Sequence, residues 1–211
     1  MDVVDEVAER VLALPSTDRR QVGVDGVDGA GKTVFGDLLA TALSSRGVTV
    51  VRASVDGFHQ PPEVRYRRGR RPPEGFFLDS YDYAAMRTLL LEPLSSGGSG
   101  RFVRAVYDVH AEHPVAAVPE SAEPDAILVV DGVFLHRPEL VGFCDLSVFL
   151  EVPFEVAVPR GASRGYGHPD PEHPSNTRYV EGQRLYLERC DPAARAAAVV
   201  DHRDLTRSRI R

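Results

Sequence analysis

The sequence predicts an α/β fold, in which a doubly wound and mainly parallel sheet of about five strands carries helices on both faces. Short apolar segments rich in Val, Ile and Leu alternate with amphipathic helical patterns along the 211 residues, an order typical of parallel sheets. Several apolar segments end at glycines or carboxylates, the residue types expected where such sheets bind ligands. No repeat at a solenoid period interrupts the pattern, so residues 1–211 are expected to form a single domain.

The composition is that of an ordinary globular protein, with 43% hydrophobic and 27% charged residues. A net charge of -6 argues against a general nucleic-acid binder. The first residues are acidic, and no apolar run approaches the ~18 residues of a membrane span. The two cysteines, Cys144 and Cys190, give neither a disulfide framework nor zinc spacing. We therefore expect a cytoplasmic protein with no membrane or nucleic-acid partner.

The N-terminal part of the chain shows a helical pattern followed by alternating strands and helices. Val3, Val7 and Val11 recur at helical spacing, which predicts a helix that packs one face against the domain. β-Branched residues predict the second strand. The elements expected here are a helix within residues 1–15, a strand over 21–25, a helix over 34–43 and a strand over 48–55.

The remainder of the chain begins with an extended loop over 60–75, where four prolines and five arginines gather. A helix over 79–91 is expected to begin with Asp79 or Ser80 as its N-cap. Fully apolar runs predict buried strands. The elements expected after this helix are a strand over 102–107, buried strands over 126–131, 146–152 and 197–200, and a helix over 177–190.

Residues 26–33, Gly-Val-Asp-Gly-Ala-Gly-Lys-Thr, fit the phosphate-binding pattern G-x-x-x-x-G-K-[ST] at every fixed position. Glycines let the backbone curl so that N–H groups converge on phosphate oxygens, and the following helix adds the positive end of its dipole. Lys32 is expected on the outer phosphates and Thr33 on Mg²⁺. The motif predicts a nucleoside triphosphate site with ATP and Mg²⁺ as cofactors, contacted by Gly26, Asp28, Gly29, Ala30, Gly31, Lys32, Thr33 and Val34.

Lys32 is the only lysine among the 25 Lys and Arg residues of the chain. Arginine replaces lysine everywhere else, so this one position has a requirement that arginine does not meet. A slim ammonium fits beneath phosphates where the broad planar guanidinium does not. The composition therefore supports the phosphate-binding interpretation independently of the motif.

Two carboxylates are expected beside the triphosphate, because each follows a predicted strand of the parallel sheet. Asp131 closes the most apolar strand and has the position of a Mg²⁺-binding Walker B residue. Asp56 follows the second strand and is placed to accept the proton of an attacking hydroxyl. Each Asp could instead cap the next turn, and the residues alone leave the division of roles open.

The P-loop and the segments 55–59, 73–82, 106–108 and 130–134 resemble the uridine kinase and phosphoribulokinase branch of the P-loop kinases. The likeness continues through 152–164 and 178–186, and so covers nearly the whole chain after residue 20. In that family the Asp after the second strand is the catalytic base, which the resemblance assigns to Asp56. The resemblance also implies a possible homo-oligomer, an acceptor-side loop at about 57–78 and a lid at about 158–176 that brings Arg160 and Arg164 over the phosphates.

The acceptor side departs from the uridine kinase pattern at several positions. Asp131 stands where those enzymes carry Glu, and Phe76 where they carry an Asp that binds sugar hydroxyls. The segment that reads the pyrimidine is represented by Tyr107-Asp108-Val109, followed by His110 or His113. The resemblance places the acceptor among Asp56, Phe58, His59, Arg65, Phe76, Tyr107, His110 and Arg184.

Two groups of arginines admit more than one interpretation. Arg160 and Arg164 are four residues apart, on one face of an expected helix, where they could stabilise transferred charge or form a solvated face. Pro159 and Gly161 weaken that helix and would suit a hinge. The arginines within residues 65–71 could clamp an anionic acceptor such as a sugar phosphate, or form a solvated loop.

Together these observations predict a kinase that transfers the γ-phosphoryl group of ATP to a hydroxyl of a small molecule. Uridine or cytidine is the first expected acceptor, and pantothenate, a sugar or a sugar phosphate are the alternatives. A regulatory nucleotide-binding protein without turnover is the competing class. A GTPase would need an N-K-x-D segment, but the single asparagine, Asn176, precedes Thr177. The tail over 201–211 is a candidate lining of the adenine pocket.

Overall fold

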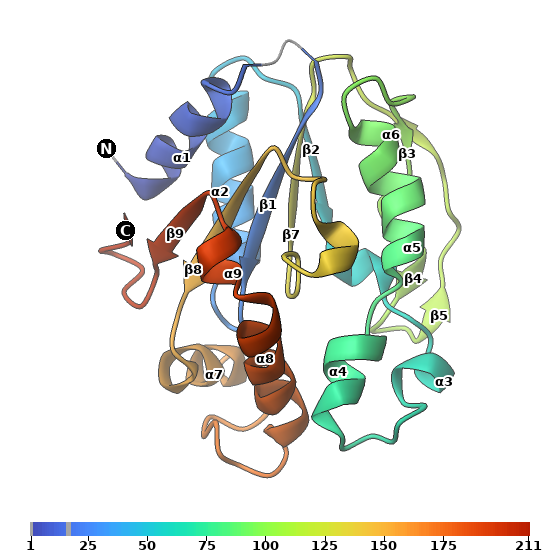
Figure 1. Cartoon of the computed structure of the whole chain (residues 1–211), viewed down its shortest axis with the longest axis vertical. Coiled ribbons are helices and arrows are strands. Elements are labelled where there is room, and N and C mark those ends of the chain that lie inside the picture. The colour runs from blue at the N-terminus through green and yellow to red at the C-terminus, as the bar shows by residue number, and fades with distance from the viewer. Residues whose placement is uncertain (1, 16–17) are drawn as a thin grey trace.

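The computed structural model describes residues 2–15 and 18–211, and within them it contains a six-stranded sheet in the order β10-β9-β8-β1-β7-β2 (Figure 1). Five strands run parallel, while β10 pairs with β9 in the antiparallel direction. The strands are β1 Arg20–Gly26, β2 Val50–Ser54, β7 Ile127–Gly132, β8 Leu146–Glu151, β9 Ala198–Asp201 and β10 Arg209–Ile210. The predicted α/β fold with a mainly parallel sheet is confirmed.

The register of the central strands brings three chain segments to one edge of the sheet. β1 lies between β7 and β8, with Val24 opposite both Asp131 and Val148. On the far side of β7, Ser54 at the end of β2 is also opposite Asp131. The P-loop, Asp56 and Asp131 therefore leave the sheet at the same carboxyl edge, where parallel sheets bind ligands.

One face of the sheet is covered by α1 (Val3–Leu12) and α2 (Lys32–Ser44) (Figure 1). The buried residues of α1 recur at helical spacing and pack with the apolar side chains of α2, β1 and β8 in one core cluster. The expected N-terminal helix and its packing are confirmed. This face holds the P-loop helix firmly against the strand that precedes it.

The other face is covered by α4 (Pro73–Asp79), a helical segment from α5 (Tyr83–Met86) through a π turn (Arg87–Leu91) to α6 (Glu92–Leu94), and α8 (Thr177–Cys190) (Figure 1). A second core cluster joins these helices to β2 and β7. Phe134 and Tyr186 lie within it, with ring centroids 5.0 Å apart. The short helix α9 (Pro192–Arg195) follows α8.

The expected helix over 79–91 begins too early. α4 already ends at Asp79, and α5 starts at Tyr83, where the Asp82 carboxylate accepts the Ala85 N–H at 2.8 Å as an N-cap. Asp79 is instead fully buried beneath arginines from the preceding connection. The sequence offered three candidate caps within four residues, and the burial of Asp79 decides among them.

The loop expected over 60–75 contains regular structure. It forms α3 (Pro62–Arg65) and then enters α4 at Pro73. Both helices carry proline in their first turn, where the missing N–H has no intrahelical partner to lose. The proline cluster therefore marks two helix starts in place of an irregular segment.

The expected strand over 102–107 is also divided. β3 (Arg101–Phe102) pairs with β6 (Glu120–Ser121), and β4 (Tyr107–Asp108) pairs with β5 (His113–Pro114). β10 was not expected, because its two residues are too short for a periodic signal. A 3₁₀ turn over Val55–Phe58 (η1) follows β2, and another over Pro138–Leu140 follows β7.

The lid region begins with α7 (Phe154–Ala162), which contains Pro159 in its last turn. Arg164 lies beyond the end of this helix, so the prediction that Arg160 and Arg164 share one helical face is wrong. α7 and the start of α8 lie at the lower edge of the sheet, beyond the ends of β1 and β8 (Figure 1). Within the described ranges, no helix has the length and apolar character needed to cross a membrane.

Candidate active site

The P-loop is shaped by two glycines with left-handed backbone angles. Gly29 has φ 78° and Gly31 has φ 96°, values that disfavour side chains with a Cβ atom. A Cβ on Gly29 would also lie 2.0 Å from the carbonyl oxygen of Ala157 in α7. The loop therefore curls tightly beneath the lid helix, and only glycine fits at this contact. This cradle fits the phosphates of a nucleoside triphosphate.

The two functional side chains of the motif lie at the start of α2. The Lys32 ammonium donates to the carbonyl of Val27 at 2.9 Å, and the Thr33 hydroxyl donates to Asp131 Oδ2 at 2.9 Å. The sequence prediction that Thr33 and Asp131 meet is borne out by this contact. A hydroxyl and a carboxylate are hard oxygen donors that suit Mg²⁺. No cluster of three or more His, Cys, Asp or Glu metal-ligand candidates occurs among the described residues, so phosphate oxygens and water would complete the shell.

Asp131 has a second partner that the sequence did not indicate. Arg52 of β2 approaches Asp131 Oδ1 at 2.9 Å and donates to the Val129 carbonyl at 2.7 Å. Its guanidinium also packs against Gly36, where a Cβ atom would lie 2.9 Å from Nη2. With both carboxylate oxygens engaged, Asp131 is placed to hold a metal through water. The signal was a lone arginine in an otherwise apolar strand.

Asp56 presents an exposed carboxylate just after β2, within η1. The backbone N–H of Asp56 donates to the Ser54 hydroxyl at 3.3 Å, and Asp56 Oδ1 accepts from Tyr81 OH at 3.1 Å. His59 Nδ1 lies 2.9 Å from the Asp56 carbonyl, and the His59 and Tyr81 rings are 4.5 Å apart. Asp56 is therefore held by its turn and by Tyr81, which the sequence did not single out.

Electrostatic coupling links Asp56 to the P-loop. Loss of solvation raises the pKa of Asp28, with Lys32 opposing and Asp56 adding to the shift. Burial raises the pKa of Tyr81 well above its usual value, and Asp56 and Asp28 add to that shift. Burial lowers the pKa of His59, which favours a neutral imidazole. Asp28 and Asp56 thus form one acidic region beside Lys32.

The lid arginine Arg160 reaches the C-terminal tail. Its guanidinium donates to the carbonyls of His202, at 3.0 Å, and of Arg203. His202 in turn lies beside the P-loop, because a Cβ on Gly31 would be 3.4 Å from its Nε2. The tail is therefore adjacent to the nucleotide cradle. Arg164 is exposed beyond α7, so the structure does not bring the two arginines together.

The predicted acceptor residues divide into two sets. Arg65 pairs with Glu112 at 2.8 Å and lies over the Tyr107 ring, 5.9 Å from its centroid, on the same side as His59. Phe58 is fully buried in the core. Phe76 is 7% exposed and packs against Phe134 and Tyr179, so its placement at the acceptor is corrected to a core role.

Two further predicted residues lie away from this region. The His110 side chain is exposed, and its backbone N–H donates to Asp108 at 2.9 Å. Arg184 pairs with Glu172 at 2.9 Å and with Glu181 at 2.6 Å. Val34, expected to contact the nucleotide, is 50% exposed on the first turn of α2. None of these contacts joins them to Asp56.

A buried polar network lies behind the P-loop. The Asp25 carboxylate is 2.6 Å from His136 Nδ1 and accepts from the Tyr186 hydroxyl. His136 Nε2 continues the chain to Ser147 at 2.9 Å. The network ties β1, just before the cradle, to α8, just after the lid. Sequence reasoning assigned Asp25 only to a strand and missed its partners.

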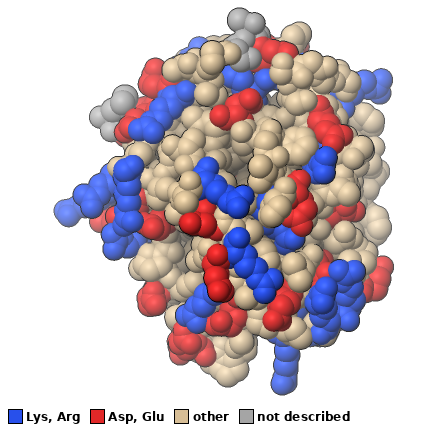
Figure 2. Space-filling view, in the orientation of Figure 1, with Lys and Arg blue, Asp and Glu red and all other residues tan. Residues whose placement is uncertain are grey.

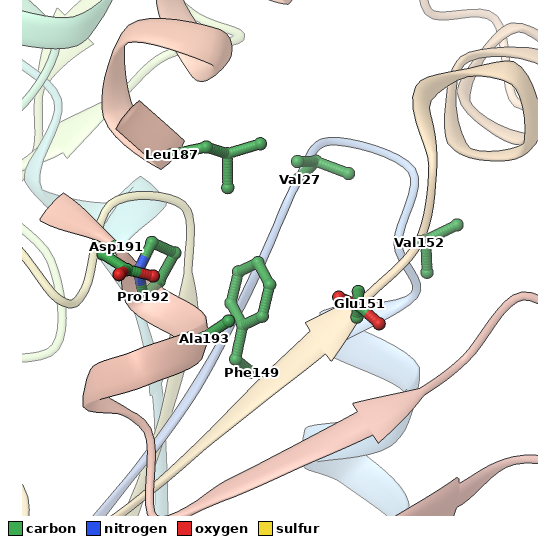
Figure 3. A pocket seen from close by; sticks show the side chains of 8 residues that line it. All are labelled: Val27, Phe149, Glu151, Val152, Leu187, Asp191, Pro192 and Ala193. Atoms are coloured by element: carbon green, nitrogen blue, oxygen red, sulfur yellow. The ribbon is translucent and has the colours of Figure 1, made fainter. Parts of the chain in front are cut away.

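A small pocket of about 170 Å³ lies between the end of β8, α8 and α9 (Figure 3). Val27, Phe149 and Leu187 give it an apolar surface, and the Glu151 and Asp191 carboxylates lie around it (Figure 3). It contains none of Lys32, Thr33, Asp56 or Asp131. The pocket is therefore separate from the reacting groups.

Solved kinase structures share the whole architecture. A possible uridine kinase from Bacillus stearothermophilus aligns with a TM-score of 0.76 at 22% identity, over 95% of this chain and 98% of that one. A candidate fructose transport system kinase from Silicibacter sp. TM1040 gives 0.72 at 21% identity, over 89% and 95%. D-Glycerate 3-kinase from Cryptococcus neoformans gives 0.60 at 11% identity, over 100% of both chains.

No family model matches the sequence. The structural similarities establish that the chain has the fold of P-loop kinases. The resemblance drawn from the motifs is confirmed at the level of fold. The three similar proteins carry names with different acceptors, so the fold does not select one.

Proposed function

We propose that the protein is an ATP-dependent phosphotransferase that moves the γ-phosphoryl group to a hydroxyl of a small molecule. The observation that carries the proposal is the exposed Asp56 carboxylate at the same sheet edge as Lys32, Thr33 and Asp131. A slow nucleotide switch has no need of a carboxylate prepared for an acceptor. The kinase fold supports the same reaction class.

In this proposal each side chain has a defined task. Lys32 binds the outer phosphates of ATP, and Thr33 with Asp131 holds Mg²⁺, which when bound supplies charge neutralisation at the phosphate oxygens. Asp56 accepts the proton of the attacking hydroxyl through Oδ2, since Oδ1 is engaged by Tyr81. The lid arginines balance charge on the transferred group. Most of the rate enhancement would come from positioning.

The acceptor is a small hydroxylated metabolite, and uridine and cytidine are the first candidates because of the motif resemblance. The test is ADP release from ATP with uridine, cytidine, pantothenate, sugars and sugar phosphates added separately. Acceptor-dependent ADP release supports the proposal. ATP binding without turnover on any acceptor would favour the regulatory class, and absence of ATP binding would overturn both.

A further inference from the structure

A groove of about 640 Å³ lies between the α3–α4 connection and the N-terminal part of α8. Its size falls within the ~300–1,000 Å³ of small-molecule sites. Three of its eight lining residues are arginines, and none of the eight carries a carboxylate. That balance is unexpected in a chain of net charge -6 and points to an anionic ligand.

The arginines of the α3–α4 connection differ in whether they are neutralised. Arg65 pairs with Glu112, and both Arg67 and Arg68 pair with the buried Asp79. Arg70 and Arg71 are exposed groove residues, and neither forms an ion pair with a carboxylate in the described part of the chain. Blue side chains gather over α3 and this connection at the lower right of Figure 2. Two guanidinium groups thus remain available at the groove.

The wall that carries Arg70 and Arg71 is fixed to α8. The buried Arg178 guanidinium donates to the carbonyls of Arg65, Gly69 and Pro72 at 2.9, 3.2 and 3.1 Å. The Arg70 guanidinium lies over the Tyr66 ring, 4.3 Å from its centroid. A connection held by three backbone bonds is a built wall, because it does not have to be ordered when a ligand binds.

The groove adjoins the acceptor side of the phosphate site. Tyr179 lines it, and the Tyr179 carbonyl accepts from Gln183 Nε2 at 3.0 Å. Gln183 Oε1 accepts the P-loop N–H of Asp28 at 2.5 Å. The groove is therefore one helical turn from the P-loop, with Asp28 and Asp56 toward one end and Arg70 and Arg71 toward the other.

We propose that this groove binds a phosphate group of the acceptor, which makes the acceptor a phosphorylated sugar or polyol. The inference rests on the proposed kinase function and narrows its substrate class. Guanidinium forks match phosphate oxygens with paired, charge-assisted hydrogen bonds, and the Ser175 and Thr177 hydroxyls at the groove add donors. A neutral nucleoside would leave these charges unused.

The kinetic test uses matched acceptors with and without phosphate: ribulose and ribulose 5-phosphate, fructose and fructose 1-phosphate, glycerol and glycerol 3-phosphate, with glycerate as a carboxylate arm. We expect the phosphorylated member to have the higher kcat/KM. The double variant Arg70→Gln/Arg71→Gln should lower that kcat/KM by about 10- to 100-fold and leave the Kd for ATP unchanged. The matched control Arg101→Gln/Arg195→Gln removes two exposed charges elsewhere and should change neither.

Equal turnover of neutral and phosphorylated acceptors, insensitive to the double variant, would overturn the inference while the kinase function stands. Preference for glycerate over glycerol 3-phosphate would also overturn it. A binding test covers the case of no turnover at all. With Lys32→Ala weakening the P-loop site, inorganic phosphate should raise Tm unless Arg70 and Arg71 are also replaced; no shift with phosphate in the Lys32→Ala protein would overturn the groove assignment.

Discussion

The nucleotide side and the acceptor side of the site are built in different ways. On the nucleotide side, backbone curvature and one helix start place Lys32 and Thr33, and the contact of Gly29 with Ala157 leaves no room for variation. On the acceptor side, short helices are held by side-chain ion pairs such as Arg68 with Asp79. The first side depends on local sequence, and the second on contacts between distant residues.

This difference separates what is general in the reaction from what is specific. Every acceptor requires the same triphosphate cradle, so its residue types are constrained by phosphate chemistry. The acceptor side can change its ion pairs and keep its framework, as the pairing of three of the five clustered arginines illustrates. Substitutions on the two sides should accordingly affect different kinetic constants.

The largest expected effect is that of Lys32→Ala. Removal of the ammonium takes away the charge that binds the outer phosphates, so turnover should fall by at least about 10³-fold and ATP binding should weaken. Steady-state ADP release and titration calorimetry measure the two quantities. Lys32→Arg is the matched control and should also fail, because its fork is too broad for the cradle. A fully active Lys32→Arg enzyme would contradict the explanation for the only lysine.

Asp56→Asn should affect the acceptor side alone. Loss of the proton acceptor should lower kcat by about 10²- to 10⁴-fold, while the Kd for ATP stays unchanged because Asp56 contacts no part of the P-loop cradle. Tyr81→Phe, which removes only the hydrogen bond to Oδ1, should have a smaller effect. Normal turnover by Asp56→Asn would remove Asp56 from the mechanism.

The same division explains how much of the molecule could be predicted from the sequence. The parallel sheet, the P-loop helix and the meeting of Thr33 with Asp131 followed from apolar periodicity and one motif. The Arg52–Asp131 pair and the Asp25 network could not, since their partners lie 79 and 111 residues away in the chain. Phe76 was misplaced because an aromatic residue in a motif position gives no sign of whether it faces the core or the acceptor.

Tyr186→Phe should reduce stability with little effect on catalysis. It removes the hydroxyl that donates to buried Asp25 and accepts the His136 N–H at 3.0 Å, which should cost about 1–3 kcal/mol. Urea unfolding followed by circular dichroism measures the change. Tyr179→Phe, on the same helix but 43% exposed, is the control for stability and should cost less than about 0.5 kcal/mol. Equal costs for the two variants would show that the Asp25 network contributes nothing to stability.

The smallest effect is expected for Arg184→Gln, which tests the boundary of the acceptor side. Arg184 was predicted at the acceptor, yet its 41%-exposed guanidinium pairs with Glu172 and Glu181 on the surface. Exposed ion pairs contribute about 0–1 kcal/mol, so both Tm and the acceptor KM should stay close to those of the wild type. If KM for the acceptor rises tenfold while Tm is unchanged, Arg184 reaches the acceptor when the lid closes. In that case the acceptor side would extend along α8 beyond Tyr179, and the two sides of the site would share one helix.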